Sequence, residues 1–275
     1  MQALLGHDLE PGAVEPVLDA LDDATARLRT AVAELPEAEL EVPSHLDGWS
    51  RLTVLAHLRA GAVASVRVTE DALAGRPTAF YPGGAPERER SLLPHDGESP
   101  GALVADLLAA SDQLAEQWRG LSADDWAVEL REPKLGRMRL TRIAALRLTE
   151  VEVHGVDLGL DGMSAWTDRF VQLCLPLRVA WLPAHARALP TADRSVNGRW
   201  LLRADTGTTW LVSAAGGLAS AAAKSDILDT QVDCVIQGTE RELMALLLGR
   251  TPVEALRISG DEALARSFKA AFPGP

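Results

Sequence analysis

The sequence has few cysteines, and this scarcity excludes disulfide-stabilised folds. Its 275 residues contain only Cys174 and Cys234, which do not form a C-x-x-C pair. Two such residues cannot make a disulfide framework, so a reducing compartment fits the chain best. Both lie in apolar surroundings. Because a catalytic thiol needs a nearby positive charge, we interpret both as core residues.

Long apolar runs and excess positive charge are also missing. No stretch approaches the roughly 18 consecutive apolar residues of a membrane span, and the first residues lack the basic segment and apolar core of a signal peptide. We therefore expect a cytoplasmic protein without a membrane partner. The net charge of -12 repels phosphate backbones, so we expect no nucleic-acid partner either. A small molecule is the expected partner, and the chain is expected to be a monomer or a dimer.

The composition is that of an ordinary folded protein, with 47% apolar and 24% charged residues. A chain of 275 residues exceeds the usual size of one domain, so two domains are expected. We place the first over residues 1–163 and the second over residues 164–275, because the pattern of apolar residues changes there.

Apolar residues recur at helical spacing in the first part of the chain. The spacing predicts four helices, over residues 14–35, 51–75, 100–121 and about 140–154. Ser50 and Ser99 are placed to cap the second and third helices, and Pro100 suits a first helical position. The proline- and glycine-rich segment 76–100 is predicted to be a loop, either a lid over a site or an ordinary solvated loop. With little strand character before residue 160, the architecture expected is an antiparallel four-helix bundle.

The remainder of the chain mixes helix and strand signals. "FVQLCLPLRVAWLPAHARAL" predicts a helix broken near Pro183, and "RWLLRADTGTTWLVSA" predicts a hairpin around a D-T-G turn. "TQVDCVIQG" alternates like a strand. A capping box from Thr239 to Glu242 then starts a helix that ends at Gly249. "ALRISG" predicts a short strand and "DEALARSFKAAF" a final helix, which together indicate an α+β domain.

Three residues of the predicted bundle are candidate metal ligands. Glu150 and His154 are four residues apart, hence on one inward helix face. His57 lies in an apolar stripe of the second helix, and the inner faces of these two helices converge in a bundle. Two imidazoles and a carboxylate with an open fourth position form the ligand set of catalytic zinc and related divalent sites. Alternatively, His57 is a hydrogen-bonded core residue and Glu150 pairs with Arg142, Arg147 or His154.

Two acidic neighbours of these ligands have different expected roles. Glu152 points away from the ligand face and is expected to be solvated. Asp157 either orients His154 as a hydrogen-bond partner or caps the turn that follows the helix.

The phrase "GWSRLTVLAHL", together with "RLTEVEVHGVDLG", resembles the paired signature of the mycothiol-dependent maleylpyruvate isomerase family. In that family a tryptophan-containing turn leads into a helix with a histidine ligand, and an E-x-x-x-H helix supplies two more. The matching positions are His57, Glu150 and His154. "VDCVIQGTERELMALLLGR" and "RISGDEALARSF" resemble its second domain. The resemblance implies an all-α, DinB-like four-helix bundle followed by a smaller α+β domain like sterol-carrier proteins.

The resemblance also implies cofactors and chemistry. The family binds a divalent metal, usually zinc, and uses mycothiol, the low-molecular-weight thiol of actinobacteria. A cation lowers the pKa of a coordinated thiol, which favours the nucleophilic thiolate. We favour S-transfer or thiol exchange on a small electrophilic metabolite, for example in natural-product biosynthesis. One alternative is cis-trans isomerisation of the maleylpyruvate type, and another is non-catalytic binding of a small molecule or lipid.

Two further residues are candidates for the same site. Arg250 matches by position an arginine of the resembled second domain that assists at the site, and its alternative role is an interaction with the macrodipole at a helix end. Trp49, just before the helix that carries His57, is predicted to contact the cofactor or substrate, unless it only packs at the loop-to-helix turn.

Overall fold

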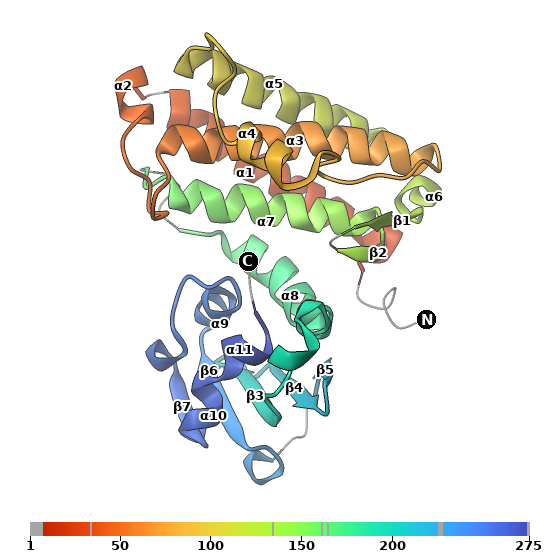
Figure 1. The fold of residues 1–275 in the computed structure, drawn as a ribbon, viewed down its shortest axis with the longest axis vertical. Coiled ribbons are helices and arrows are strands. Elements are labelled where there is room, and N and C mark those ends of the chain that lie inside the picture. Colours follow the sequence, from red (N-terminus) through yellow and green to blue (C-terminus); the bar gives the residue numbers. More distant parts are fainter. Residues whose placement is uncertain are drawn as a thin grey trace. The chain divides into compact units, whose positions relative to one another are not determined.

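The computed structural model describes residues 8–33, 35–133, 135–160, 162–163, 165–224 and 228–273. The chain forms two compact units, Met1–Phe170 and Val171–Pro275 (Figure 1). The first is a bundle of helices and the second combines a sheet with helices, which confirms the predicted fold class. Within the described residues, no helix is both long and apolar enough to cross a bilayer.

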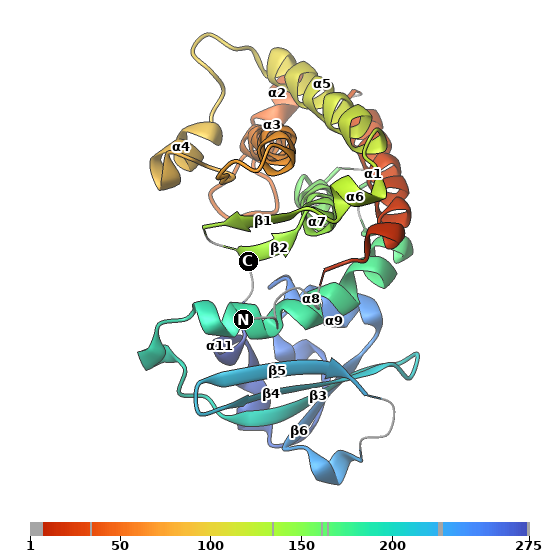
Figure 2. The same ribbon diagram turned by 90° about the vertical axis from the view of Figure 1, so that its right-hand side faces the viewer.

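Four long helices build the first unit, and Figure 2 shows two of them, α3 and α7, nearly end-on. They are α1 (Glu15–Ala33), α3 (Arg51–Leu73), α5 (Pro100–Arg119) and α7 (Thr141–Asp157). The predicted caps are present, since the hydroxyls of Ser50 and Ser99 accept hydrogen bonds from the backbone N–H groups of Thr53 and Ala102. Fully buried leucines from α3, α5 and α7 fill the space between the helices. The bundle therefore follows directly from the helical spacing of apolar residues.

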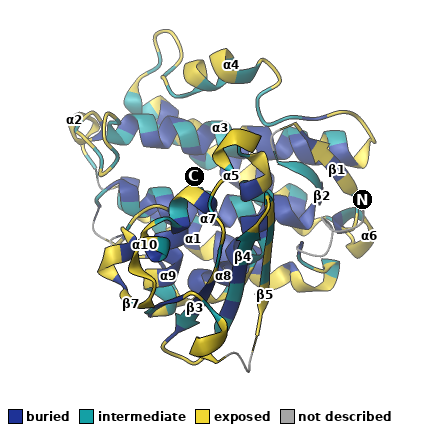
Figure 3. Ribbon diagram, turned by 60° about the horizontal axis from the view of Figure 1, so that its bottom comes forward, coloured by how far each residue is buried: buried dark blue, intermediate teal, exposed yellow. Residues whose placement is uncertain are grey.

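Short elements connect the long helices, and three of them correct the sequence prediction. They are α2 (Glu37–Leu40), α4 (Gly84–Ser91), α6 (Ala123–Trp126), β1 (Glu129–Glu132) and β2 (Gly136–Arg139). The predicted loop over 76–100 contains α4, which has no buried residue and is partly exposed and partly intermediate in Figure 3. The β1–β2 hairpin was not predicted, because each strand has four residues and buries only one or two of them.

The second unit contains a five-stranded sheet in the order β5-β4-β3-β6-β7. Its strands are β3 (Gly198–Ala204), β4 (Thr209–Ala215), β5 (Leu218–Ala223), β6 (Cys234–Gly238) and β7 (Arg257–Gly260). β3 and β4 form the predicted hairpin, with Trp200 opposite Val212. β6 pairs with β3 in parallel, and α9 (Glu240–Leu247) follows it with the predicted capping box of Thr239 and Glu242. β5 was not predicted, because its small residues lack the alternation of a half-buried strand.

Two helix predictions in this part of the chain were wrong. Helix α8 (Asp168–Ala188) continues through Pro176 and Pro183 rather than breaking. Its buried residues Leu175, Val179, Leu182 and Ala186 keep one continuous apolar stripe, so packing outweighs the lost backbone hydrogen bonds.

The final helix also differs from its prediction. It is two short helices, α10 (Glu262–Arg266) and α11 (Phe268–Ala271), which meet at Ser267. Phe268 and Phe272 lie edge-on to Trp200, with ring centroids 6.1 and 5.5 Å from that of the indole. Both phenylalanines of this region therefore pack against Trp200 in the core of the second unit.

Candidate metal centre

The three predicted ligands lie together in the first unit. The ring Nε2 of His57 on α3 is 2.7 Å from Oε2 of Glu150 on α7, and Nε2 of His154 is 3.4 Å from the same oxygen. One donor atom from each residue lies within 4.8 Å of the others. The imidazoles are largely buried, whereas 41% of the Glu150 side chain is exposed. The carboxylate therefore borders both the protein interior and the solvent.

The loop before α3 fixes the relative position of α3 and α7. The side chain of Arg51 donates to the carbonyls of Leu158 and Gly159, just beyond the end of α7. The backbone N–H of His45 donates to the carbonyl of Asp157. Gly159 has a φ of 65°, and a Cβ there would lie 2.7 Å from the His45 ring. Only glycine fits this close approach, which joins the start of α3 to the end of α7.

Hydrogen bonds orient His154 and set the charge of the cluster. Asp157 Oδ2 lies 2.8 Å from Nδ1 of His154, so Nε2 faces Glu150. Burial lowers the pKa of His154, but the hydrogen bonds to Asp157 and Glu150 outweigh it and raise the pKa to about 9. Burial also acts to raise the pKa of Glu150, but hydrogen bonds from His154 and His57 hold it well below its usual range. Of the two roles considered for Asp157, the structure shows the orienting contact.

The donor set fits a divalent cation. The raised pKa of His154 favours a proton on its Nε2, next to the Glu150 carboxylate. A cation bound there would replace that proton. Nδ1 of His57 is buried and has no hydrogen-bond partner within the described part of the chain. Two histidine nitrogens and one carboxylate oxygen form one of the ligand sets of catalytic zinc, which leaves the fourth coordination position open. These three residues could hold the ion.

Trp49 lies beside both imidazoles. Its ring centroid is 5.7 Å from that of His57 in an edge-on arrangement and 6.5 Å from that of His154 in a stacked one. The indole is partly exposed. It therefore forms one wall next to the ligand cluster, and its contact with a cofactor stays a prediction.

The segment between α3 and α5 is anchored to α3 at both ends. The Arg67 guanidinium donates to the carbonyls of Ala79 and Phe80, and the buried side chains of Arg59 and Glu98 pair at 2.6 Å. Between these anchors, burial and the charge of Glu150 raise the pKa of the Tyr81 phenol.

The nearness of Tyr81 to Glu150 was not predicted from the sequence. A lone aromatic residue in a loop gives no periodic signal that would place it near α7. That the segment acts as a lid stays one of the two alternatives predicted for it.

Arg250 lies in the second unit, outside the ligand cluster. It follows Gly249 after the end of α9, its backbone N–H donates to the carbonyl of Ala245, and it is exposed. Its predicted role at the site stays a prediction.

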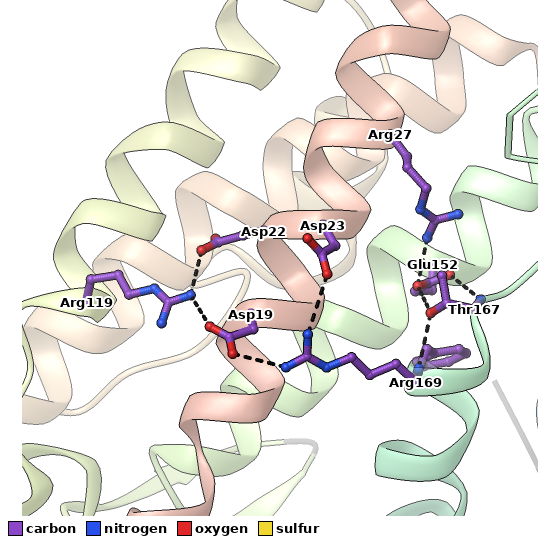
Figure 4. A network of polar contacts seen from close by, with 9 residues as sticks. Asp19, Asp22, Asp23, Arg27, Arg119, Glu152, Thr167 and Arg169 are labelled. Carbon is purple, nitrogen blue, oxygen red and sulfur yellow. Dashed lines mark hydrogen bonds and ion pairs between the residues drawn. The ribbon is translucent and has the colours of Figure 1, made fainter.

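The prediction for Glu152 was wrong, because its side chain is buried rather than solvated. It is 1% exposed and accepts hydrogen bonds from Arg27 of α1 at 2.8 Å and from the Thr167 hydroxyl at 2.6 Å (Figure 4). The side of α7 opposite the ligands packs against α1, so pointing away from the ligands does not mean pointing into solvent. Arg27 and Thr167 lie 125 and 15 residues from Glu152 in the sequence. The periodicity of α7 alone therefore could not predict these two contacts.

A cavity of about 280 Å³ lies between α1 and α5. Its acidic lining residues are paired, Asp22 with Arg119 and Asp112 with Arg29. The side chain of Arg147 from α7 also reaches it. Because none of the three candidate ligands lines this cavity, it is separate from the ligand cluster.

Comparison with known proteins gives one family match. The family model described as the mycothiol maleylpyruvate isomerase N-terminal domain matches residues 21–159, a range that contains all three candidate ligands. No curated protein matches the chain.

Solved structures are similar in fold. The crystal structure of the mycothiol-dependent maleylpyruvate isomerase has a TM-score of 0.66 and 19% sequence identity, covering 90% of this chain and 92% of that one. A histidine-to-alanine mutant of that enzyme matches with the same values. YfiT from Bacillus subtilis matches with a TM-score of 0.47 and 19% identity, over 55% of this chain and 86% of its own.

Proposed function

Because this chain belongs to the mycothiol maleylpyruvate isomerase N-terminal domain family, we propose that it is an enzyme that binds a divalent metal, zinc in our proposal, and uses mycothiol as its thiol. The observation that carries this proposal is the convergence of His57, Glu150 and His154 at the α3–α7 interface. Membership in the family also confirms the resemblance seen in the sequence.

The residues of the cluster support thiol activation in complementary ways. A bound cation would lower the pKa of a coordinated thiol, so that the thiolate would be present near neutral pH. Asp157 holds the His154 ring so that Nε2 faces Glu150. The partly exposed carboxylate of Glu150 gives the cluster an open side, and Trp49 borders both imidazoles there.

Three reactions of a thiolate fit this arrangement. S-transfer to a small electrophile forms a new C–S bond and consumes mycothiol. Thiol exchange also consumes mycothiol but releases the thiol that it displaces, whereas cis-trans isomerisation adds mycothiol to a double bond and releases it again. The family match and the shared fold over 90% of the chain favour isomerisation at least as strongly as transfer. Our choice of transfer depends on the exposed α4 segment, which would leave room for a larger substrate. Arg250 is proposed to assist from the second unit.

Thiol consumption distinguishes these reactions. With mycothiol in slight excess over an electrophilic substrate, transfer or exchange should remove one mycothiol per product, and isomerisation should leave the mycothiol concentration unchanged; exchange alone should release a second thiol. Glutathione and bacillithiol in place of mycothiol test the choice of thiol.

Metal analysis combined with calorimetry tests the proposal itself. Purified wild type should hold about one divalent ion per chain and bind mycothiol, whereas His154→Ala should lose both properties because a ligand is removed. His95→Ala is a matched control, since this histidine is exposed and outside the cluster.

Loss of metal without loss of mycothiol binding would contradict the proposed mechanism. Wild type without metal, and without a zinc-dependent change in stability, would instead favour the non-catalytic binding protein.

A further inference from the structure

Arg147 is a buried arginine at the edge of the ligand cluster. It lies one turn before Glu150 on α7, is 3% exposed, and donates from Nη1 to the carbonyl of Leu58 at 2.9 Å. Leu58 directly follows His57 on α3. The guanidinium is therefore held at the α3–α7 interface next to the cluster.

The guanidinium has no carboxylate partner among the residues that the structure describes. In the described ranges its Nε has no hydrogen-bond partner, and no Asp or Glu forms an ion pair with it. On α3, a Cβ at Gly61 would come within 3.1 Å of Nη1, so the helix backbone approaches closely there. In the cavity between α1 and α5, Asp22 and Asp112 are already paired with other arginines. A buried arginine without a counter-charge is unusual, because burying an unpaired ion costs several kcal/mol.

Arg147 keeps its charge at neutral pH. Burial lowers its pKa to about 10, and the charge of Glu150 acts in the opposite direction. The neighbouring Arg59 does not add to the charge of the site, because it is paired with Glu98. Arg147 therefore brings a buried positive charge into interaction with Glu150 of the cluster.

Arg147 changes the net charge of the metal-bound site. Glu150 and Asp157 contribute two negative charges, and two neutral imidazoles contribute none. A divalent ion would make these groups neutral overall, with no net attraction for an anion. With Arg147 included, the same site carries one positive charge. Inside a protein such a charge acts over several ångströms with little screening.

This inference rests on the proposed function and deepens it. We propose that Arg147 sets the charge of the metal centre so that its open position selects an anion, such as a thiolate or a carboxylate, over a neutral ligand. The positive charge of Arg147 lowers the affinity for the metal ion and raises the affinity of the bound metal for an anion. Its removal should therefore change the two affinities in opposite directions, which a purely structural role would not do.

Cobalt(II) and azide are suitable probes, because both titrations are followed by the visible absorption of the cobalt ion. Relative to wild type, Arg147→Gln should bind cobalt about tenfold more tightly, and the cobalt-loaded variant should bind azide about tenfold more weakly. Glutamine retains a donor for the Leu58 carbonyl. Arg147→Lys, which keeps the charge, should stay within about threefold of wild type in both titrations.

Arg142→Gln is the matched control. This buried arginine lies on the same helix, about 12 Å along its axis from Glu150, and both affinities should stay at the wild-type values. If Arg147→Gln does not fold, Arg147→Met replaces it, because proteins often tolerate an apolar side chain of similar volume in place of a buried ion.

The possible results separate the two proposals. Loss of both affinities in the neutral variants, or no change in either, would overturn the role of Arg147. Failure of wild type to bind cobalt would instead contradict the proposed metal site itself.

Discussion

Within α7, residues a few positions apart have different surroundings. Glu150 and His154 face His57, whereas Glu152 faces α1 and Arg147 lies beside the backbone of α3. Helical geometry rotates the side chain by about 100° per residue, so charged residues in one short stretch meet different helices. Each must therefore be interpreted through its own neighbours.

Asp157 is expected to control metal affinity without being a ligand. Asp157→Asn should weaken zinc binding about tenfold to a hundredfold, because the amide no longer stabilises the His154 ring orientation with a full negative charge. Competition with a chromophoric chelator measures the affinity. Asp124→Asn, an exposed change in α6, should not alter it, and an unchanged affinity in Asp157→Asn would show that the contact does not orient the ligand.

Lys269 should make stability depend on pH. Burial, and secondarily the charge of Arg178, lowers its pKa to about 8 from 10.5. The unfolded chain therefore binds more protons than the folded chain between these values, so the free energy of unfolding should rise as pH increases from 8 to 10.5. Lys269→Met should remove this rise. Urea unfolding at pH 7.5 and 10.5 measures it, and equal pH slopes for both proteins would contradict the assigned shift.

At the scale of elements, Glu152 joins three parts of the first unit. Its carboxylate contacts Arg27 of α1 and Thr167, which directly precedes α8, and Arg169 continues the network to Asp19 and Asp23 (Figure 4). The charged side of α7 thus connects the bundle to the chain that leaves it. This contact is separate from the ligand side of the same helix.

Removing this charge should reduce stability but not metal content. Glu152→Gln should lower the free energy of unfolding by about 2–3 kcal/mol, because it leaves Arg27 without its partner beside a buried amide. Glu129→Gln, which breaks an exposed pair with Arg137, should change it by less than about 1 kcal/mol. Chemical unfolding and metal analysis of both variants provide the comparison. Loss of metal in Glu152→Gln would show that the two sides of α7 are coupled.

At the scale of the whole molecule, the two units have separate cores. The first is closed by the four long helices and the second by the sheet with the aromatic group around Trp200. Both cysteines are buried in the second unit, and burial raises the pKa of Cys234 to about 12. The thiol chemistry proposed for this protein must therefore come from a small-molecule thiol.

Metal binding should stabilise one unit only. Zinc at about 100 times its dissociation constant should add about 2.7 kcal/mol to the first unit, which slows its most protected amides about a hundredfold. Hydrogen exchange followed by mass spectrometry should show this slowing in α3 and α7, and none in β3 and β6. Equal slowing in all four elements would show that the units unfold together.

Features that depend on near neighbours could be predicted from the sequence alone. Helix positions, the caps at Ser50, Ser99 and Thr239, and the shared face of Glu150 and His154 all follow from spacings of a few residues. The β1–β2 hairpin and β5 escaped prediction because such short strands carry too little periodic signal.

Only the tertiary structure decided which distant residues meet. It brought His57 to Glu150 across 93 residues and Arg27 to Glu152 across 125. Among the residues that the structure describes, it also left Arg147 without a carboxylate partner. The physical reason is that periodicity specifies the face of a helix, whereas packing between helices specifies what that face touches.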